Sequence, residues 1–144
     1  IRDLRSLLDR HHLTYGMFGH VDAGCLHVRP ALDLRQEQDA QLMRKISDEV
    51  ALLVARYGGV LWGEHGKGLR AEYVEATLGK NYYALMQRVK KLFDPYNQFN
   101  PGKLATPDAT QTLLKIDEAP LRASFDRGIE AELEKEFPKA VACN

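Results

Sequence analysis

The segment 19–27 constrains the fold most, because it is typical of a β-hairpin. Residues suited to strands flank the dipeptide Ala23-Gly24, and tight hairpin turns favour glycine. A turn at this dipeptide predicts pairing between residues whose numbers add up to 47, so that His20 faces His27. Directly opposed side chains of an antiparallel pair lie about 5 Å apart at Cβ. The hairpin therefore predicts two imidazoles close enough to bind one ion.

A second glycine-rich segment, 63–68, follows a short apolar run and carries Glu64 and His65. Two ionisable side chains in such a loop are costly unless they have a task. We expect Glu64 to be a third ligand beside His20 and His27. Two histidines and one carboxylate leave coordination positions open on a divalent metal, as in catalytic sites. The alternative is that these histidines are ordinary surface or core residues.

The two segments and a third, 93–103, together resemble the C-terminal cap domain of FAD-linked oxidases. Proteins of that kind include D-lactate dehydrogenases, glycolate oxidase D subunits and D-2-hydroxyglutarate dehydrogenases. They carry Gly-His-x-x-x-Gly-x-x-His, then Gly-Glu-His-Gly, then Phe-Asp-Pro followed by Asn-Pro-Gly-Lys. All three motifs occur here in the same order, over about residues 12 to 104. A match to three ordered motifs is more specific than a match to any one of them.

The resemblance implies roles for individual residues. His20, His27 and Glu64 would bind a divalent metal, with zinc the expected ion, and His65 would be the base that takes the substrate hydroxyl proton. An unperturbed imidazole, with a pKa of about 6.5, suits that task at neutral pH. A loop-stabilising role is the alternative for His65. Asn100, in the third motif, would contact the cofactor.

Arg29 departs from the pattern of the smaller D-2-hydroxyglutarate dehydrogenases, which have asparagine two residues after the second histidine. By period-two alternation Arg29 shares a hairpin face with His27, and its guanidinium can hold a substrate carboxylate bidentately. A solvated arginine at a strand end is the alternative. Cys25 lies on the same face and is interpreted as a small core residue.

Composition limits the remaining possibilities. The chain has 144 residues, of which 44% are hydrophobic, and this favours one domain. Its 20 basic and 20 acidic side chains give no net charge, so the composition does not indicate nucleic-acid binding. No apolar run approaches the length of a membrane span, so a cytoplasmic location is expected, with attachment to the inner face of the membrane as a variant. Two distant cysteines do not indicate a disulfide framework. Because the chain begins at Ile1, we expect a fragment of a longer protein.

The fold class predicted is α+β, as part of a larger cap domain. A small antiparallel sheet, formed by region 13–30 and by Val60 to Trp62, is expected to be covered on one face by helices 34–57 and 80–93. Residues 1–104 form the partial cap domain, and residues 105–144 a loosely packed linker with a late helix. Further helices are predicted over 2–11 and 69–78.

The expected function is that of the substrate- and metal-binding part of a flavin-dependent dehydrogenase that oxidises a D-2-hydroxy acid to the 2-oxo acid. FAD would be bound mainly by an upstream domain of the same polypeptide, so the fragment alone is expected to be inactive. The terminal Cys143-Asn144 is similar to the start of an iron–sulfur motif in long family members. Two alternatives are a non-catalytic, metal-stabilised cap or assembly module and a metal-dependent hydrolase. The sequence leaves the oligomeric state open.

Overall fold

A computed structural model describes residues 1–34, 36–118 and 131–136. Helix α1 (Arg2–Arg10) precedes strands β1 (Tyr15–His20) and β2 (Cys25–Pro30), and helix α2 (Glu37–Arg56) follows them. A 3-10 helix, η1 (Gly68–Tyr73), leads into α3 (Val74–Leu78) and α4 (Lys80–Phe93), and α5 covers Ala131–Glu136. Helices and a two-stranded antiparallel sheet confirm the α+β class.

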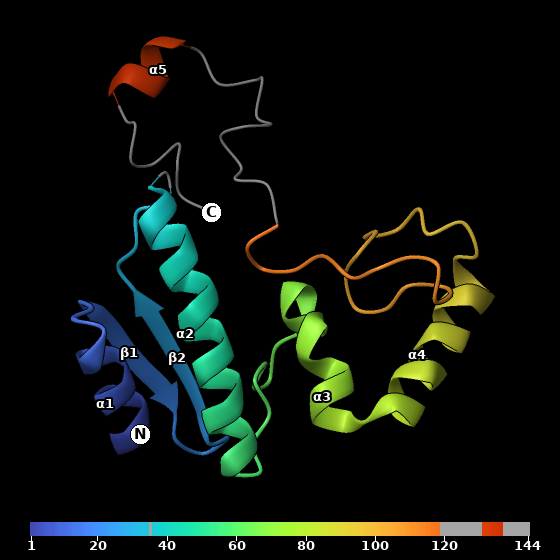
Figure 1. Cartoon of the computed structure of the whole chain (residues 1–144), viewed down its shortest axis with the longest axis horizontal. Coiled ribbons are helices and arrows are strands. Elements are labelled where there is room, and N and C mark those ends of the chain that lie inside the picture. Colours follow the sequence, from blue (N-terminus) through green and yellow to red (C-terminus); the bar gives the residue numbers. More distant parts are fainter. Residues whose placement is uncertain (35, 119–130, 137–144) are drawn as a thin grey trace.

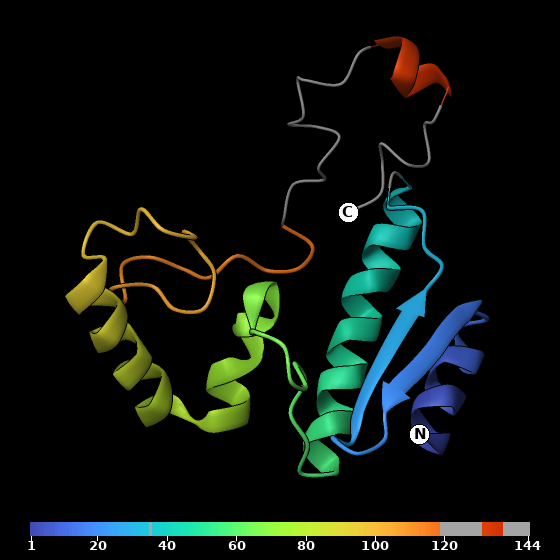
Figure 2. The same ribbon diagram turned by 180° about the vertical axis from the view of Figure 1, so that it is seen from behind.

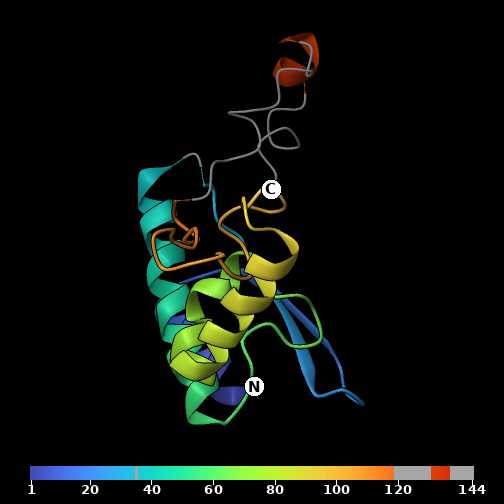
Figure 3. The same ribbon diagram turned by 90° about the vertical axis from the view of Figure 1, so that its right-hand side faces the viewer.

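Helices pack against one face of the hairpin β1–β2, and no helix of the described residues covers its other face (Figure 3). Figure 3 shows α1 and α2 on the same side of the hairpin. The apolar core lies between them and consists of Leu7, Leu8 and Ile46. Tyr15, Met17 and Val28, which alternate along the strands, pack against it from the sheet. The hairpin residues of opposite parity, including His20 and His27, therefore point away from the core.

The register of the hairpin differs from the predicted one by two residues. His20 pairs with Cys25 and Phe18 pairs with His27, so paired residue numbers add up to 45. The turn has four residues instead of two: the Gly24 N–H donates to the Val21 carbonyl at 3.4 Å, and Gly24 has φ +64°. A shift of two residues preserves the parity of every side chain. His20 and His27 are therefore diagonal neighbours on one face instead of direct partners.

The run Val60–Trp62 is not a strand, and the prediction of a third strand was wrong. Successive turns occupy this segment, in which the Gly63 N–H donates to the Val60 carbonyl and the His65 N–H to the Trp62 carbonyl. Val60 is 46% exposed. The sheet within the described residues has two strands. Three apolar residues between glycine-rich stretches do not hold an extended conformation without a pairing strand.

Helix α4 does not cover the sheet, contrary to the prediction. It packs against α3, and both helices lie to one side of the hairpin and α2 in two opposite views (Figures 1 and 2). The predicted apolar stripe exists, but Tyr82, Val89 and Phe93 on it are exposed. The helix ends at Phe93 with Asp94 as its C-cap, as expected before a proline.

A loosely packed linker was expected immediately after Lys103, but the residues there are packed against the rest of the chain. Ala105, Thr106 and Pro107 are buried. The Thr106 hydroxyl accepts a hydrogen bond from the amide of Gln87 in α4 at 3.1 Å. The late helix corresponds to α5, whereas positions 125, 129 and 137 of the predicted apolar stripe lie outside the described residues. A domain boundary at residue 104 stays a prediction.

Candidate functional site

The loop between α2 and η1 brings Glu64 to the free face of the hairpin. Gly63 enables this approach, because it has φ +54° and a Cβ atom at this position would lie 2.7 Å from the sulfur of Cys25. Glycine adopts that backbone without strain and, because it has no Cβ atom, fits that space. Cys25 is buried under the loop, in agreement with its interpretation as a small core residue.

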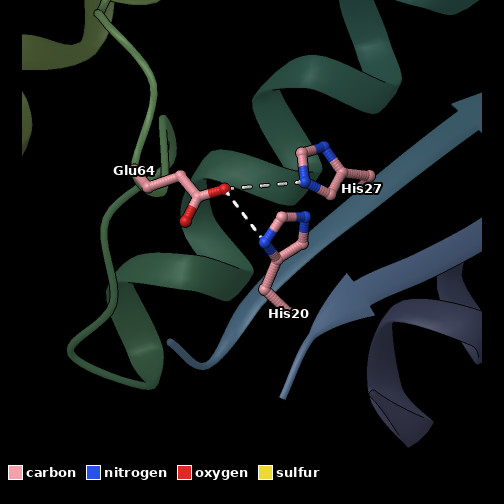
Figure 4. Close-up of side chains that lie close together, drawn as sticks. All are labelled: His20, His27 and Glu64. Atoms are coloured by element: carbon pink, nitrogen blue, oxygen red, sulfur yellow. Dashed lines mark ion pairs between the residues drawn. The ribbon is translucent and has the colours of Figure 1, made fainter. Parts of the chain in front are cut away.

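His20, His27 and Glu64 converge at this point (Figure 4). One ligand atom from each lies within 4.8 Å of the others. His20 Nδ1 is 3.4 Å and His27 Nε2 is 3.9 Å from Glu64 Oε1. The three side chains come from β1, β2 and the loop that follows α2, so that tertiary contacts assemble the set.

The donor set fits a divalent metal. Two imidazole nitrogens and a carboxylate oxygen are ligands that zinc accepts, and three protein ligands leave a position for substrate. His27 Nε2 is buried and has no hydrogen-bond partner within the part of the chain that the structure describes. A buried polar atom without a partner is costly, and coordination of a cation would satisfy it. The carboxylate also supplies the negative charge that a cation requires.

His65 is adjacent to the three potential ligands and more exposed. Its ring packs edge-on against His27 with centroids 5.0 Å apart, and its Nε2 lies 3.9 Å from Glu64 Oε1. The side chain is 61% exposed, so the imidazole is open to a substrate from outside the chain. The structure thus brings His65 together with the predicted metal ligands.

Phe18 belongs to the same face, although the sequence interpretation missed it. Its ring stacks on His27 with centroids 4.8 Å apart and an interplanar angle of 14°. The guanidinium of Arg29 lies over the Phe18 ring, 5.9 Å from its centroid. Period-two alternation from His20 would have placed Phe18 here under either register. Arg29 is therefore on the predicted face.

Asn100 is not part of this cluster. It lies in the turn after α4, where its carbonyl accepts a hydrogen bond from the Lys103 N–H at 3.1 Å and its φ is +48°. That turn is well separated from the hairpin in Figures 1 and 2. A contact between Asn100 and a cofactor remains a prediction.

Comparison with known protein families shows to which family the chain belongs. Residues 1–104 match the family model described as FAD linked oxidases, C-terminal domain. The chain belongs to this family. The matched range contains the whole histidine cluster and the Asn100 turn. The predicted resemblance is thereby confirmed.

Curated relatives are similar over most or all of the chain. D-2-hydroxyglutarate dehydrogenases of Pseudomonas putida and Escherichia coli are 56% and 51% identical over 100% of the chain. The glycolate oxidase subunit GlcD of Bacillus subtilis is 29% identical over 79% of the chain and 24% of its own length. The chain spans 14% of the length of the two dehydrogenases. No solved structure matches it significantly. Among the described residues of this family member, no helix has the length and hydrophobicity needed to cross a membrane.

Proposed function

We propose that this domain supplies the metal- and substrate-binding part of a flavin-dependent dehydrogenase that oxidises a D-2-hydroxy acid to the 2-oxo acid. The observation that carries the proposal is the convergence of His20, His27 and Glu64 beside an exposed His65. The names of the relatives favour D-2-hydroxyglutarate over lactate or glycolate as the substrate. The remainder of a longer polypeptide would bind FAD.

His20, His27 and Glu64 would hold a divalent metal, and zinc suits this donor set. When bound, the ion supplies Lewis acidity that lowers the pKa of the substrate hydroxyl. Glu64 has a second task, since its carboxylate lies near the rings of all three histidines and offsets positive charge that gathers there. The His65 side chain is largely exposed, which leaves its imidazole accessible to a substrate.

His65 would accept the hydroxyl proton at Nε2, the ring nitrogen nearest Glu64. Arg29 would orient the substrate by binding a carboxylate with its planar guanidinium. FAD, bound by the rest of the protein, would supply the hydride-accepting chemistry. Proton transfer, substrate orientation and redox chemistry are thus assigned to different groups. Because the FAD-binding part would lie outside this chain, the isolated chain is expected to have no dehydrogenase activity. An iron–sulfur domain after Cys143 stays a prediction, and that cysteine lies outside the described residues.

Two substitutions in the full-length protein test the assignment. His65→Ala should lower kcat about 100- to 10,000-fold, because a positioned base is lost, while bound metal is retained. His27→Ala should lose both metal and activity, because a ligand is lost. Steady-state kinetics on D-2-hydroxyglutarate and D-lactate, with metal analysis of each purified variant, distinguish the two roles.

His12→Ala is a matched control, since this exposed histidine lies outside the cluster. It should leave both metal content and kcat unchanged. Full kcat in His65→Ala would contradict the base assignment and favour a metal that only stabilises the fold.

A further inference from the structure

Among the residues that the structure describes, none forms with the His27 imidazole the hydrogen bond that usually orients a metal-binding histidine. In metal sites the ring nitrogen that does not bind the metal commonly donates to a carboxylate or a carbonyl oxygen. Within the described residues, no hydrogen bond to the His27 ring is present; its Nε2 faces Glu64 Oε1 at 3.9 Å. The contacts that orient the ring within the described residues are therefore packing contacts.

Three aromatic rings contact the His27 imidazole, and they differ in their angle to its plane. His20 is tilted at 49° with centroids 5.0 Å apart, and His65 meets the ring edge-on at 78°. Phe18 alone lies flat against the imidazole, at 4.8 Å and 14°. It is also the residue paired with His27 in the sheet, so the backbone fixes the contact. A rotation of the imidazole about its Cβ–Cγ bond would break this stack.

The exposure of Phe18 is informative. The side chain is 53% exposed on the face of the hairpin opposite the apolar core. Packing in the apolar core therefore does not explain why a phenylalanine occupies this position. The ring contacts His27 and the Arg29 guanidinium, which lies 5.9 Å from the ring centroid. Gly16, opposite Arg29, has no side chain, which leaves space for the guanidinium to lie over the neighbouring ring.

We infer that Phe18 is a positioning residue, which holds the His27 imidazole with Nε2 toward Glu64 and keeps the Arg29 guanidinium beside it. The inference rests on the proposed function. The phenyl ring of Phe18 offers no metal-binding atom; it restricts the rotation of one ligand and the reach of one anion-binding side chain. Its loss should weaken metal binding even though all three ligands remain.

The test compares zinc affinity in the full-length protein with Phe18 replaced. Phe18→Ile keeps a residue suited to strands but removes the flat ring, whereas Phe18→Tyr keeps the ring. Competition with a chromophoric chelator should show zinc binding weakened about 10- to 100-fold in Phe18→Ile, the range seen when groups that orient a ligand are removed. Phe18→Tyr should retain an affinity within about two-fold of the wild type on the same reasoning.

Leu26→Ala is the matched control, because it shortens a partly exposed apolar side chain of the same hairpin on the opposite face. It should lower the thermal midpoint without changing zinc affinity. Wild-type zinc affinity in Phe18→Ile, with a thermal midpoint lowered as in Leu26→Ala, would overturn the inference and leave Phe18 as a sheet-stabilising residue. Phe18→Leu replaces Phe18→Ile if the latter does not fold. A wild-type protein that binds no zinc would overturn the proposed metal site, and the inference with it.

Discussion

The region of α1, the hairpin and α2 differs from the region of η1, α3, α4 and residues 94–118 in how it is stabilised. The first region has an apolar core in which Leu7, Leu8 and Ile46 are buried. In the second, two polar side chains, Asp94 and Thr106, are buried beside the apolar Ala71, Val74 and Ala105. Hydrophobic burial is non-directional, whereas polar contacts require defined partners. The site lies where a loop from the junction of the two regions reaches the hairpin.

Arg44 in α2 joins the two regions. Its guanidinium donates to Glu72 Oε2 at 2.8 Å and to Asp117 Oδ1 at 3.1 Å, and it contacts the Tyr73 hydroxyl. Burial by itself lowers the pKa of this guanidinium, but hydrogen bonding to Glu72 and the surrounding charge outweigh burial and raise the pKa above its ordinary value. Arg44 is thus a permanently charged link between an apolar region and a polar one.

The largest expected effect is on the apolar core. Leu8→Ala should lower the free energy of unfolding by about 2–5 kcal/mol, because Leu8 is 1% exposed and its loss leaves a cavity. Urea unfolding followed by circular dichroism measures the change. Leu52→Ala in α2, where the side chain is 73% exposed, is the control and should be close to neutral. Equal effects of the two substitutions would show that the first region is not built around this core.

A smaller effect is expected when the link between the regions is broken. Arg44→Met should cost about 1–3 kcal/mol, because the mostly buried Glu72 carboxylate loses its cationic partner. The double substitution Arg44→Met with Glu72→Gln should recover part of the loss, since the uncompensated charge is removed. Urea unfolding of the three variants gives the coupling between the two residues. No recovery would indicate that Arg44 acts through its other contacts.

At the junction, Gly63→Ala should cost about 1–2 kcal/mol, because alanine is strained at φ +54°. It should also displace Glu64 from the histidines, since the new Cβ would meet the Cys25 sulfur at 2.7 Å. Zinc affinity in the full-length protein should fall accordingly. Gly66→Ala in the same loop is the control, because a Cβ there meets open space. If both variants bind zinc equally well, the close approach at Gly63 does not position the site.

The smallest effect concerns acid stability of the second region. Burial raises the pKa of Asp94, but the Lys90 ammonium and the backbone N–H groups of Gln98 and Phe99 outweigh burial, so that the pKa lies below its ordinary value of 3.8. Asp94 therefore contributes stability above about pH 3.8, which is lost as the pH falls through the lowered pKa. Asp94→Asn should lower stability at neutral pH and flatten its acid dependence. Urea unfolding at a series of pH values measures the slope, and an unchanged slope would contradict this role.

Sequence patterns predicted the elements of the first region well and the arrangement of the second poorly. Helix α2 was expected from an apolar stripe that includes Ile46, and that stripe is the one buried against the hairpin. The stripe of α4 was equally regular, yet Val89 and Phe93 on it are exposed. Periodicity identifies the face of a helix but does not specify what covers it. The position of α4 depends on α3 and on contacts such as that of Thr106 with Gln87.

The sequence by itself predicted that His20 and His27 share a face, and this held because the predicted turn of two residues and the observed turn of four give the same side-chain parity. It also identified the family through three ordered motifs, which the family model bears out. Only the tertiary structure decided the register, in which His27 pairs with Phe18. It also placed Glu64 3.4 Å from His20, since residues far apart in sequence meet through a loop whose path depends on Gly63 and Cys25. The local sequence pattern determines toward which face of a sheet each side chain of a strand points. The distance between segments that are far apart in sequence is set by tertiary packing.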